Sequence, residues 1–123
     1  MSHAGLTIAV VEDDDAMRRS IERVLRAHGY ATEAFSDAEA FLASGVATRF
    51  KGLVLDIHLR GISGIELQRR LRASGSILPV IFITAYDEPA TQAEALAVGC
   101  IGYLRKPFNA DELADALARG VAV

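Results

Sequence analysis

Residues 6–15 read LTIAVVEDDD, a mostly apolar and β-branched run that ends abruptly in four acidic residues. A run of this kind, without alternating polar residues, is typical of a strand that is covered on both faces. The acidic residues lead into a stretch with apolar side chains at helical spacing, which predicts a helix to about His28. Asp14 or Asp15 is the expected N-cap of that helix.

The same pattern recurs along the chain. Further strands are expected at Tyr30–Phe35, Gly52–Asp56, Pro79–Thr84 and Ile101–Arg105. Helical patterns separate and follow these strands, with Ser36 as one expected N-cap, supported by Glu39 in a capping box, and Asn109 as the cap of the last helix. Strictly alternating strands and helices imply an α/β fold with a parallel sheet and helices on both faces.

Right-handed crossovers leave a doubly wound, flavodoxin-like sheet as the natural closure. The order 2-1-3-4-5 is the usual arrangement of five strands at this length, which is 123 residues. We therefore expect a single domain over residues 1–123 with its core in 6–119. With 51% hydrophobic residues, the chain can bury a core without disulfide or metal staples.

Composition narrows the function classes. The single cysteine, Cys100, excludes a disulfide framework and fits a reducing, cytoplasmic setting. No stretch resembles a signal peptide or can span a bilayer, so no membrane association is expected. The net charge of −3 argues against direct nucleic-acid binding, and we interpret the arginines of the helices as solvated faces.

Polar side chains follow the predicted strands at their carboxyl ends. Glu12 and Asp13 follow the first strand, Asp56 ends the third, Thr84 ends the fourth and Lys106 follows the fifth. In an open parallel sheet, ligands bind beyond this edge, at the point where the strand order reverses. The sequence therefore predicts one pocket with three carboxylates, one hydroxyl and one ammonium.

The chemistry of such a pocket suits phosphoryl transfer. Three neighbouring carboxylates repel one another, and a divalent cation removes that conflict. Few, hard oxygen ligands favour Mg²⁺ that keeps several waters and leaves positions for phosphoryl oxygens. Lys106 adds a mobile positive charge, Thr84 a hydroxyl donor, and one carboxylate can act as the nucleophile.

These motifs resemble the response-regulator receiver domain of two-component signalling. The matching pieces stand at four strand ends in the right order: VVED at 10–13, LD at 55–56, ITA at 83–85 and KPF at 106–108. The resemblance covers residues 6 to about 118. The segments SDAEAFL at 36–42, SGIEL at 63–67 and VIFIT at 80–84 resemble the branch of nitrogen-fixation regulators with a LuxR-type DNA-binding domain.

The resemblance implies roles for individual residues. Asp56 would be the phosphorylated aspartate and would also ligate Mg²⁺. Asp13 would bind the ion directly and Glu12 through water, and the backbone carbonyl of His58 would complete the protein ligands. The domain would be a phosphoacceptor that catalyses only its own phosphotransfer and dephosphorylation, and not an enzyme with a separate substrate.

The remaining roles concern the switch. Lys106 would contact the phosphoryl group, and its bond to Pro107 is a cis peptide in this family. Thr84 would move toward the phosphoryl group, and Tyr103 would follow by a change of rotamer. Exposed positions are implied to form a kinase-docking patch: Asp14, Ala16, Met17, Ser20, Pro107 and Phe108.

The implied partners are a histidine kinase or a phosphotransfer protein, and a DNA-binding effector that is either C-terminal or separate. A phosphorylation-dependent homodimer is possible, with Ala90–Val98, Gly102–Arg105 and Asp111–Arg119 as the expected surface. The chain ends soon after the last predicted helix, so a stand-alone receiver and a part of a longer regulator both stay open.

Four positions vary from, or tune, the family pattern. Glu12 stands where aspartate is most frequent, and its side chain reaches one methylene further. Arg60 stands where the family usually has proline, and it places a positive charge near the mouth of the pocket. His58 and Tyr86 occupy positions that in this family modulate the access of water to the phosphoaspartate, and a bulky Tyr86 suggests shielding.

The same residues bear on other functions that this fold could have. A haloacid-dehalogenase-type phosphatase needs a second aspartate two residues after the first, and His58 stands there. A flavodoxin-like cofactor carrier needs phosphate-binding donors in its first loop, whereas residues 12–15 are acidic and would repel a phosphate that came without a metal. A receiver that acts as a docking or dimerisation module without phosphorylation stays open as the alternative.

Overall fold

The computed structural model describes residues 6–45 and 49–120. Five strands and five helices alternate strictly in this part of the chain. Their bounds are β1 Thr7–Val11, α1 Asp15–Ala27, β2 Ala31–Phe35, α2 Ala38–Ala43, β3 Gly52–Asp56, α3 Gly64–Ala73, β4 Val80–Thr84, α4 Pro89–Val98, β5 Gly102–Arg105 and α5 Ala110–Gly120.

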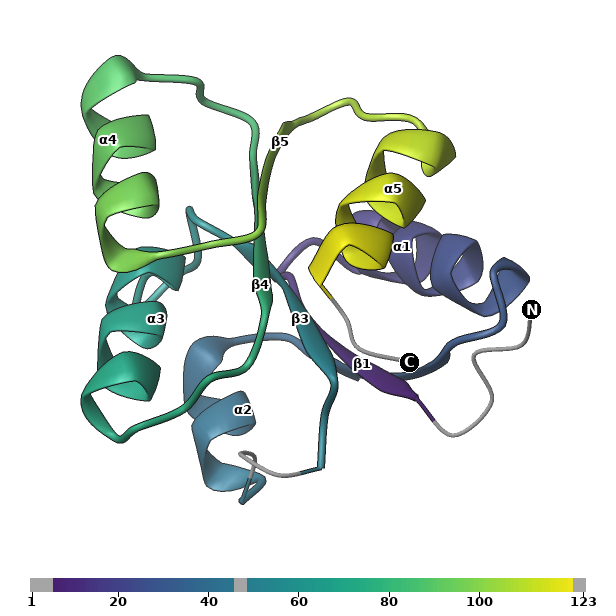
Figure 1. The fold of residues 1–123 in the computed structure, drawn as a ribbon, viewed down its shortest axis with the longest axis horizontal. Coiled ribbons are helices and arrows are strands. Elements are labelled where there is room, and N and C mark those ends of the chain that lie inside the picture. The colour runs from purple at the N-terminus through teal and green to yellow at the C-terminus, as the bar shows by residue number, and fades with distance from the viewer. Residues whose placement is uncertain (1–5, 46–48, 121–123) are drawn as a thin grey trace.

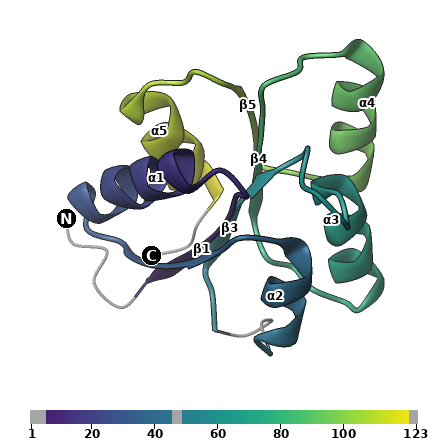
Figure 2. The same ribbon diagram turned by 180° about the vertical axis from the view of Figure 1, so that it is seen from behind.

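The strands form one parallel sheet in the order β2-β1-β3-β4-β5, as the sequence predicts. Helices α1 and α5 lie side by side on one face of this sheet, and α2, α3 and α4 cover the other face (Figure 1). The view from behind shows the same three layers (Figure 2). The strand order reverses between β1 and β3, so their carboxyl ends form the edge at which a site is expected.

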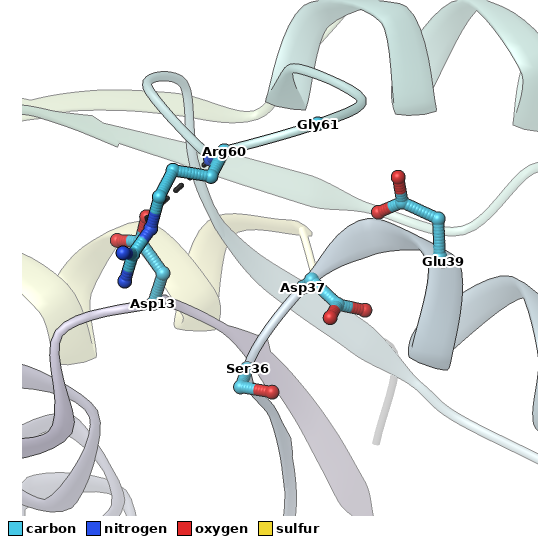
Figure 3. A pocket seen from close by; sticks show the side chains of 6 residues that line it. All are labelled: Asp13, Ser36, Asp37, Glu39, Arg60 and Gly61. Carbon is cyan, nitrogen blue, oxygen red and sulfur yellow. Dashed lines mark hydrogen bonds and ion pairs between the residues drawn. The ribbon is translucent and has the colours of Figure 1, made fainter.

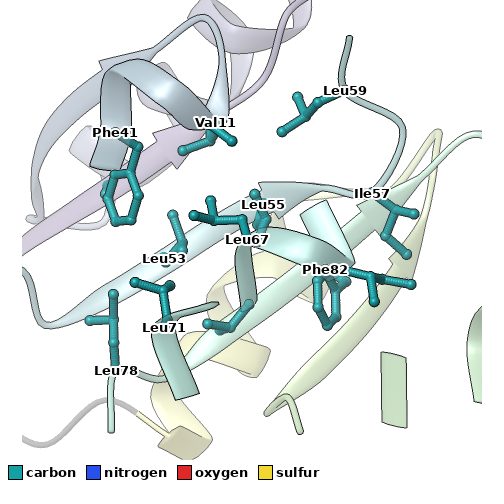
Figure 4. Close-up of a cluster of buried hydrophobic side chains, with 14 of the residues drawn as sticks. Val11, Phe41, Leu53, Leu55, Ile57, Leu59, Leu67, Leu71, Leu78 and Phe82 are labelled. Carbon is teal, nitrogen blue, oxygen red and sulfur yellow. The ribbon is translucent and has the colours of Figure 1, made fainter. Parts of the chain in front are cut away.

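Two apolar clusters hold the helices against the sheet. The larger one joins alternate side chains of β3 with Phe41 of α2 and with Leu67 and Leu71 of α3 (Figure 4). The other packs Ile21 and Leu25 of α1 and three residues of α5 against the opposite side chains of the strands. Every residue of β3 and β4 is buried, which explains their continuous apolar sequence.

The ends of the helices agree with most of the predicted caps. The Asp14 side chain accepts a hydrogen bond from the backbone N–H of Met17, at 2.8 Å. Asn109 Oδ1 likewise accepts from the N–H of Glu112, whose carboxylate accepts from the N–H of Asn109 in return. Both caps satisfy N–H groups that a helix leaves without partners in its first turn.

One predicted cap is wrong. Asp37, and not Ser36, caps α2, because its Oδ1 accepts the N–H of Ala40 at 2.7 Å. The expected capping box does not form, since Glu39 accepts a hydrogen bond from the N–H of Ile62 in the β3–α3 loop instead. Strands β1, β2, β4 and β5 each begin one residue later than predicted.

Candidate functional site

Three carboxylates meet at the carboxyl ends of β1 and β3. Each of Glu12, Asp13 and Asp56 offers an oxygen within 4.8 Å of the others. The parallel register explains the convergence: Val11 lies opposite Leu55, so the residues that follow each of them leave the sheet at the same level. Carboxylate oxygens so close together suit a small divalent cation, which would relieve their mutual repulsion.

Glu12 is the most deeply buried of the three. Its side chain is fully buried, and Lys106 Nζ lies 2.6 Å from its Oε1. Burial is the main reason that the pKa of Glu12 is raised, to about 7. The hydrogen bond from Lys106 opposes this shift, and the nearby Asp56 adds to it. The pKa of Lys106 is raised as well: its own burial opposes this, but the hydrogen bond to Glu12 and the charge of Asp56 outweigh it.

Asp56 ends β3 with its side chain only 5% exposed. One carboxylate oxygen accepts a hydrogen bond from the N–H of His58 at 3.1 Å, and Lys106 Nζ lies 3.4 Å from the other. The site therefore holds Asp56 from two sides with a backbone donor and a cation. The Lys106–Pro107 peptide bond is cis, as the resemblance implies.

Asp13 lies at the outer side of the cluster and is partly exposed. Its Oδ2 is 3.4 Å from the backbone nitrogen of Arg60 and 3.6 Å from the guanidinium Nε of the same residue. Together with Ser36, Asp37, Glu39 and Gly61, these two residues line a pocket beside the carboxylate cluster (Figure 3). Figure 3 shows the Arg60 side chain extending from the β3–α3 loop down to Asp13.

Thr84 is buried at the end of β4, and its hydroxyl forms hydrogen bonds with the backbone two residues further on. Its hydroxyl donates a hydrogen bond to the carbonyl of Tyr86 and accepts one from the N–H of Tyr86. On the neighbouring strand, the hydroxyl oxygen of Tyr103 is buried and has no hydrogen-bond partner among the described residues. Burial, and secondarily the charge of Asp87, raise the pKa of Tyr103.

The predicted docking positions share one edge of the molecule but differ in exposure. Asp14, Ala16 and Pro107 are exposed. Met17 and Phe108 are partly buried, since both pack against the α1–α5 side of the core. These two residues offer only part of their surface to a partner, because the rest is used for packing.

Sequence reasoning missed one residue that positions the site. Arg18 of α1 donates from Nη1 to the backbone carbonyl of Glu12 at 2.9 Å and pairs through Nη2 with Asp15. The side chain thus ties the first turn of α1 to the end of β1. The spacing of Asp15 and Arg18 signals a helical ion pair, but it carries no sign of the contact with the strand end.

Comparison with known proteins agrees with this geometry. A family model described as "Response regulator receiver domain" matches residues 8–118. The chain belongs to this family. The receiver domain resembles the transcriptional regulatory protein FixJ of Bradyrhizobium diazoefficiens, with 36% identity over 106 residues, which are 86% of this chain and 52% of that protein. Nodulation protein W of the same organism is 37% identical over 110 residues, or 89% of this chain and 48% of that protein.

Solved receiver structures share the fold. The crystal structure of FixJ-N superposes with a TM-score of 0.85 at 31% identity and covers 96% of this chain and 98% of that one. The response regulator StyR gives a TM-score of 0.88 at 37% identity and covers 96% of this chain and 60% of that one. The receiver chain thus spans about half the length of the curated relatives named above. Among the described residues, no helix is long and apolar enough to cross a membrane.

Proposed function

We propose that this receiver is a signalling switch in which Asp56 accepts a phosphoryl group from a histidine kinase or a phosphotransfer protein, in a Mg²⁺-dependent reaction. One observation carries the proposal: Asp56 lies within 4.8 Å of the Glu12 and Asp13 carboxylates and also faces the ammonium of Lys106 at 3.4 Å. An acidic cluster beside one cation is the donor set that phosphoryl transfer requires.

The residues present fit a magnesium ion. Asp13 and Asp56 would bind it directly, Glu12 through water and His58 through its backbone carbonyl. The ion would neutralise the charge that develops on the phosphoryl oxygens. The raised pKa of Glu12, about 7, supports this assignment, because it shows how strongly the buried site disfavours a further uncompensated negative charge.

The chain's own residues account for the chemical step. An Asp56 carboxylate oxygen attacks phosphorus, a new oxygen–phosphorus bond forms, and the bond between phosphorus and the donor nitrogen breaks. Lys106 is placed to stay with the phosphoryl oxygens, since its ammonium already faces Asp56. The N–H of His58 fixes the other Asp56 oxygen and so orients the nucleophile.

The output follows from the two polar groups beyond Asp56. To reach a phosphoryl group, the Thr84 hydroxyl has to give up its hydrogen bond to the carbonyl of Tyr86. Tyr103 lines a hollow with Asp87, Arg105 and Lys106, between the loops that follow β4 and β5. A rearrangement of Thr84 is therefore expected to alter the α4–β5–α5 surface, which would act on a DNA-binding effector or form a homodimer.

The docking of the kinase would use the exposed edge around the site. Asp14 and Ala16 at the start of α1 and Pro107 after β5 are exposed and flank the carboxylates. Met17, Ser20 and Phe108 would add partial apolar and hydroxyl surface. This arrangement would bring the phosphorylated side chain of a partner to Asp56.

The test is phosphorylation by acetyl phosphate with and without Mg²⁺, read by intact mass. Wild type should gain the mass of one phosphoryl group only with Mg²⁺, and Asp56→Asn should gain none. Asp13→Asn should keep its fold and lose most of the reaction. A folded wild type that binds Mg²⁺ but gains no phosphoryl group, either from acetyl phosphate or from a panel of histidine kinases, would favour the docking-module alternative.

A further inference from the structure

Arg60 reaches across the mouth of the site to a single carboxylate. Its backbone nitrogen and its guanidinium Nε lie 3.4 Å and 3.6 Å from the same atom, Oδ2 of Asp13. These contacts join the β3–α3 loop to the end of β1, 47 residues earlier in the chain. The side chain therefore takes part in the environment of the proposed metal ligand, although it comes from a different element.

Arg60 pairs with Asp13 and not with the other carboxylates that line the pocket. Two other carboxylates line the same pocket, and both are engaged by backbone donors. Asp37 caps α2 through the N–H of Ala40, and Glu39 accepts the N–H of Ile62. Figure 3 shows the Asp37 carboxylate pointing away from the Arg60 guanidinium, and the Glu39 carboxylate pointing to the β3–α3 loop, where it meets the N–H of Ile62. Asp13 is thus the acid in this pocket that pairs with the cation of Arg60.

The ion pair between Arg60 and Asp13 is weak enough to be displaced. The Arg60 side chain is 89% exposed, whereas that of Asp13 is 21% exposed. An ion pair with such an exposed partner is weak and exchanges readily with water. The backbone N–H of Arg60 holds Asp13 in place independently, so the guanidinium can leave without releasing the carboxylate.

We propose that Arg60 is a tethered cation that competes with the divalent metal ion for Asp13 and thereby sets the metal affinity of this receiver. The inference rests on the proposed function, because it takes Asp13 as a metal ligand. An exposed ion pair and the repulsion between two cations predict an effect of about two- to five-fold on the dissociation constant. Arg60 would then determine how much Mg²⁺ is needed before Asp56 can react.

Metal binding can be measured without any phosphoryl transfer. Mn²⁺ replaces Mg²⁺ as the probe. The protein is titrated with Mn²⁺, and the concentration of free Mn²⁺ is measured by electron paramagnetic resonance. Arg60→Gln should bind Mn²⁺ about two- to five-fold more tightly than wild type, and Arg60→Lys should stay near wild type. The difference should shrink between about 50 and 300 mM NaCl, because salt screens exposed charges.

Two control variants separate the possible causes. Arg23→Gln removes the same charge from an exposed position on α1, and it should leave the affinity for Mn²⁺ unchanged. Equal tightening in Arg23→Gln, or unchanged or weaker binding in Arg60→Gln, overturns the inference. With either of these results, the proposed function still stands if wild type binds Mn²⁺ and Asp13→Asn abolishes that binding. If neither wild type nor Arg60→Gln binds Mn²⁺, both the proposed function and the inference about Arg60 are overturned.

Discussion

The ammonium of Lys106 lies nearer to Glu12 than to Asp56: Nζ is 2.6 Å from the Glu12 oxygen and 3.4 Å from that of Asp56. The lysine proposed to assist the phosphoacceptor is thus paired mainly with a proposed metal ligand. Both carboxylates are almost fully buried, so the single ammonium compensates charge that water cannot reach. Any neutralisation of Glu12 from another source would free Lys106 for Asp56.

Replacing Lys106 by methionine tests this compensation. Lys106→Met should lower the free energy of unfolding at pH 8 by about 1–3 kcal/mol, because it leaves buried charge without a partner. The loss should be smaller at pH 5.5, where Glu12 takes up a proton. Urea unfolding of the variant in the Glu12→Gln background provides the control, and a loss of the same size there would show that the pair carries no coupling.

The raised pKa of Glu12 predicts an unusual dependence of stability on pH. The folded chain holds the Glu12 proton up to a pKa of about 7, whereas the unfolded chain releases it near the ordinary glutamate pKa of 4.5. The folded state therefore binds more protons in this window, and the free energy of unfolding falls as pH rises through it. The slope from this one group is at most about 1.4 kcal/mol per pH unit.

Glu12→Gln isolates the contribution of that side chain. Urea unfolding between pH 5 and pH 8 with EDTA present should show a flatter dependence on pH for the variant than for wild type. Gln keeps the shape of the side chain but cannot ionise, so the comparison removes the titration alone. Parallel curves for the two proteins would mean that Glu12 titrates normally.

The alternation of the sequence was sufficient to predict the fold. Continuous apolar runs such as Gly52–Asp56 are stable only where helices cover both faces of the sheet. The strand order then follows from the right-handed crossovers between parallel strands. The cap of α2 was predicted wrongly because Ser36 and Asp37 are both good N-caps. The structure also pairs Glu39 with the N–H of Ile62 in the β3–α3 loop, and such a contact between distant segments leaves no local signal in the sequence.

The candidate site could be predicted in its members but not in its pairings. Strand ends in a parallel sheet must converge, so the cluster of Glu12, Asp13 and Asp56 follows from topology. Which carboxylate receives Lys106 depends on burial and on distances of a few tenths of an ångström. The contact of Arg60 with Asp13 was missed for the same reason, although the position of Arg60 at the mouth of the site was expected.

Gly64 shows how closely α3 packs beneath Asp56, the proposed phosphoacceptor. A β-carbon at this position would overlap the backbone carbonyl oxygen of Asp56. Gly64→Ala should therefore displace the start of α3, lower the free energy of unfolding by about 1–3 kcal/mol and slow phosphorylation of Asp56. Gly75→Ala is the matched control, because its positive φ of 88° adds strain while nothing lies within 4 Å of the new atom. Equal phosphorylation rates in the two variants would contradict the prediction.

His58 and Tyr86 are expected to affect the lifetime of the proposed phosphorylated form. The rings of His58 and Tyr86 meet edge to face with centroids 5.1 Å apart, and they come from the loops after β3 and β4. Tyr86 is 63% exposed, so packing of the core does not explain why a large ring stands at this position. The pair joins the loops that follow β3 and β4, and it would limit the approach of water to the proposed phosphoaspartate at position 56.

Tyr86→Ala should therefore shorten the half-life of the phosphorylated protein several-fold, while Tyr86→Phe, which keeps the ring, should retain it. The decay is followed by intact mass after removal of the phosphodonor, with Mg²⁺ held constant. Leu96→Ala removes another exposed apolar side chain, on α4, and controls for general loss of surface. If Tyr86→Ala and Tyr86→Phe decay at the same rate as wild type, the aromatic contact does not shield the site, and the lifetime is set by the residues that hold Asp56 itself.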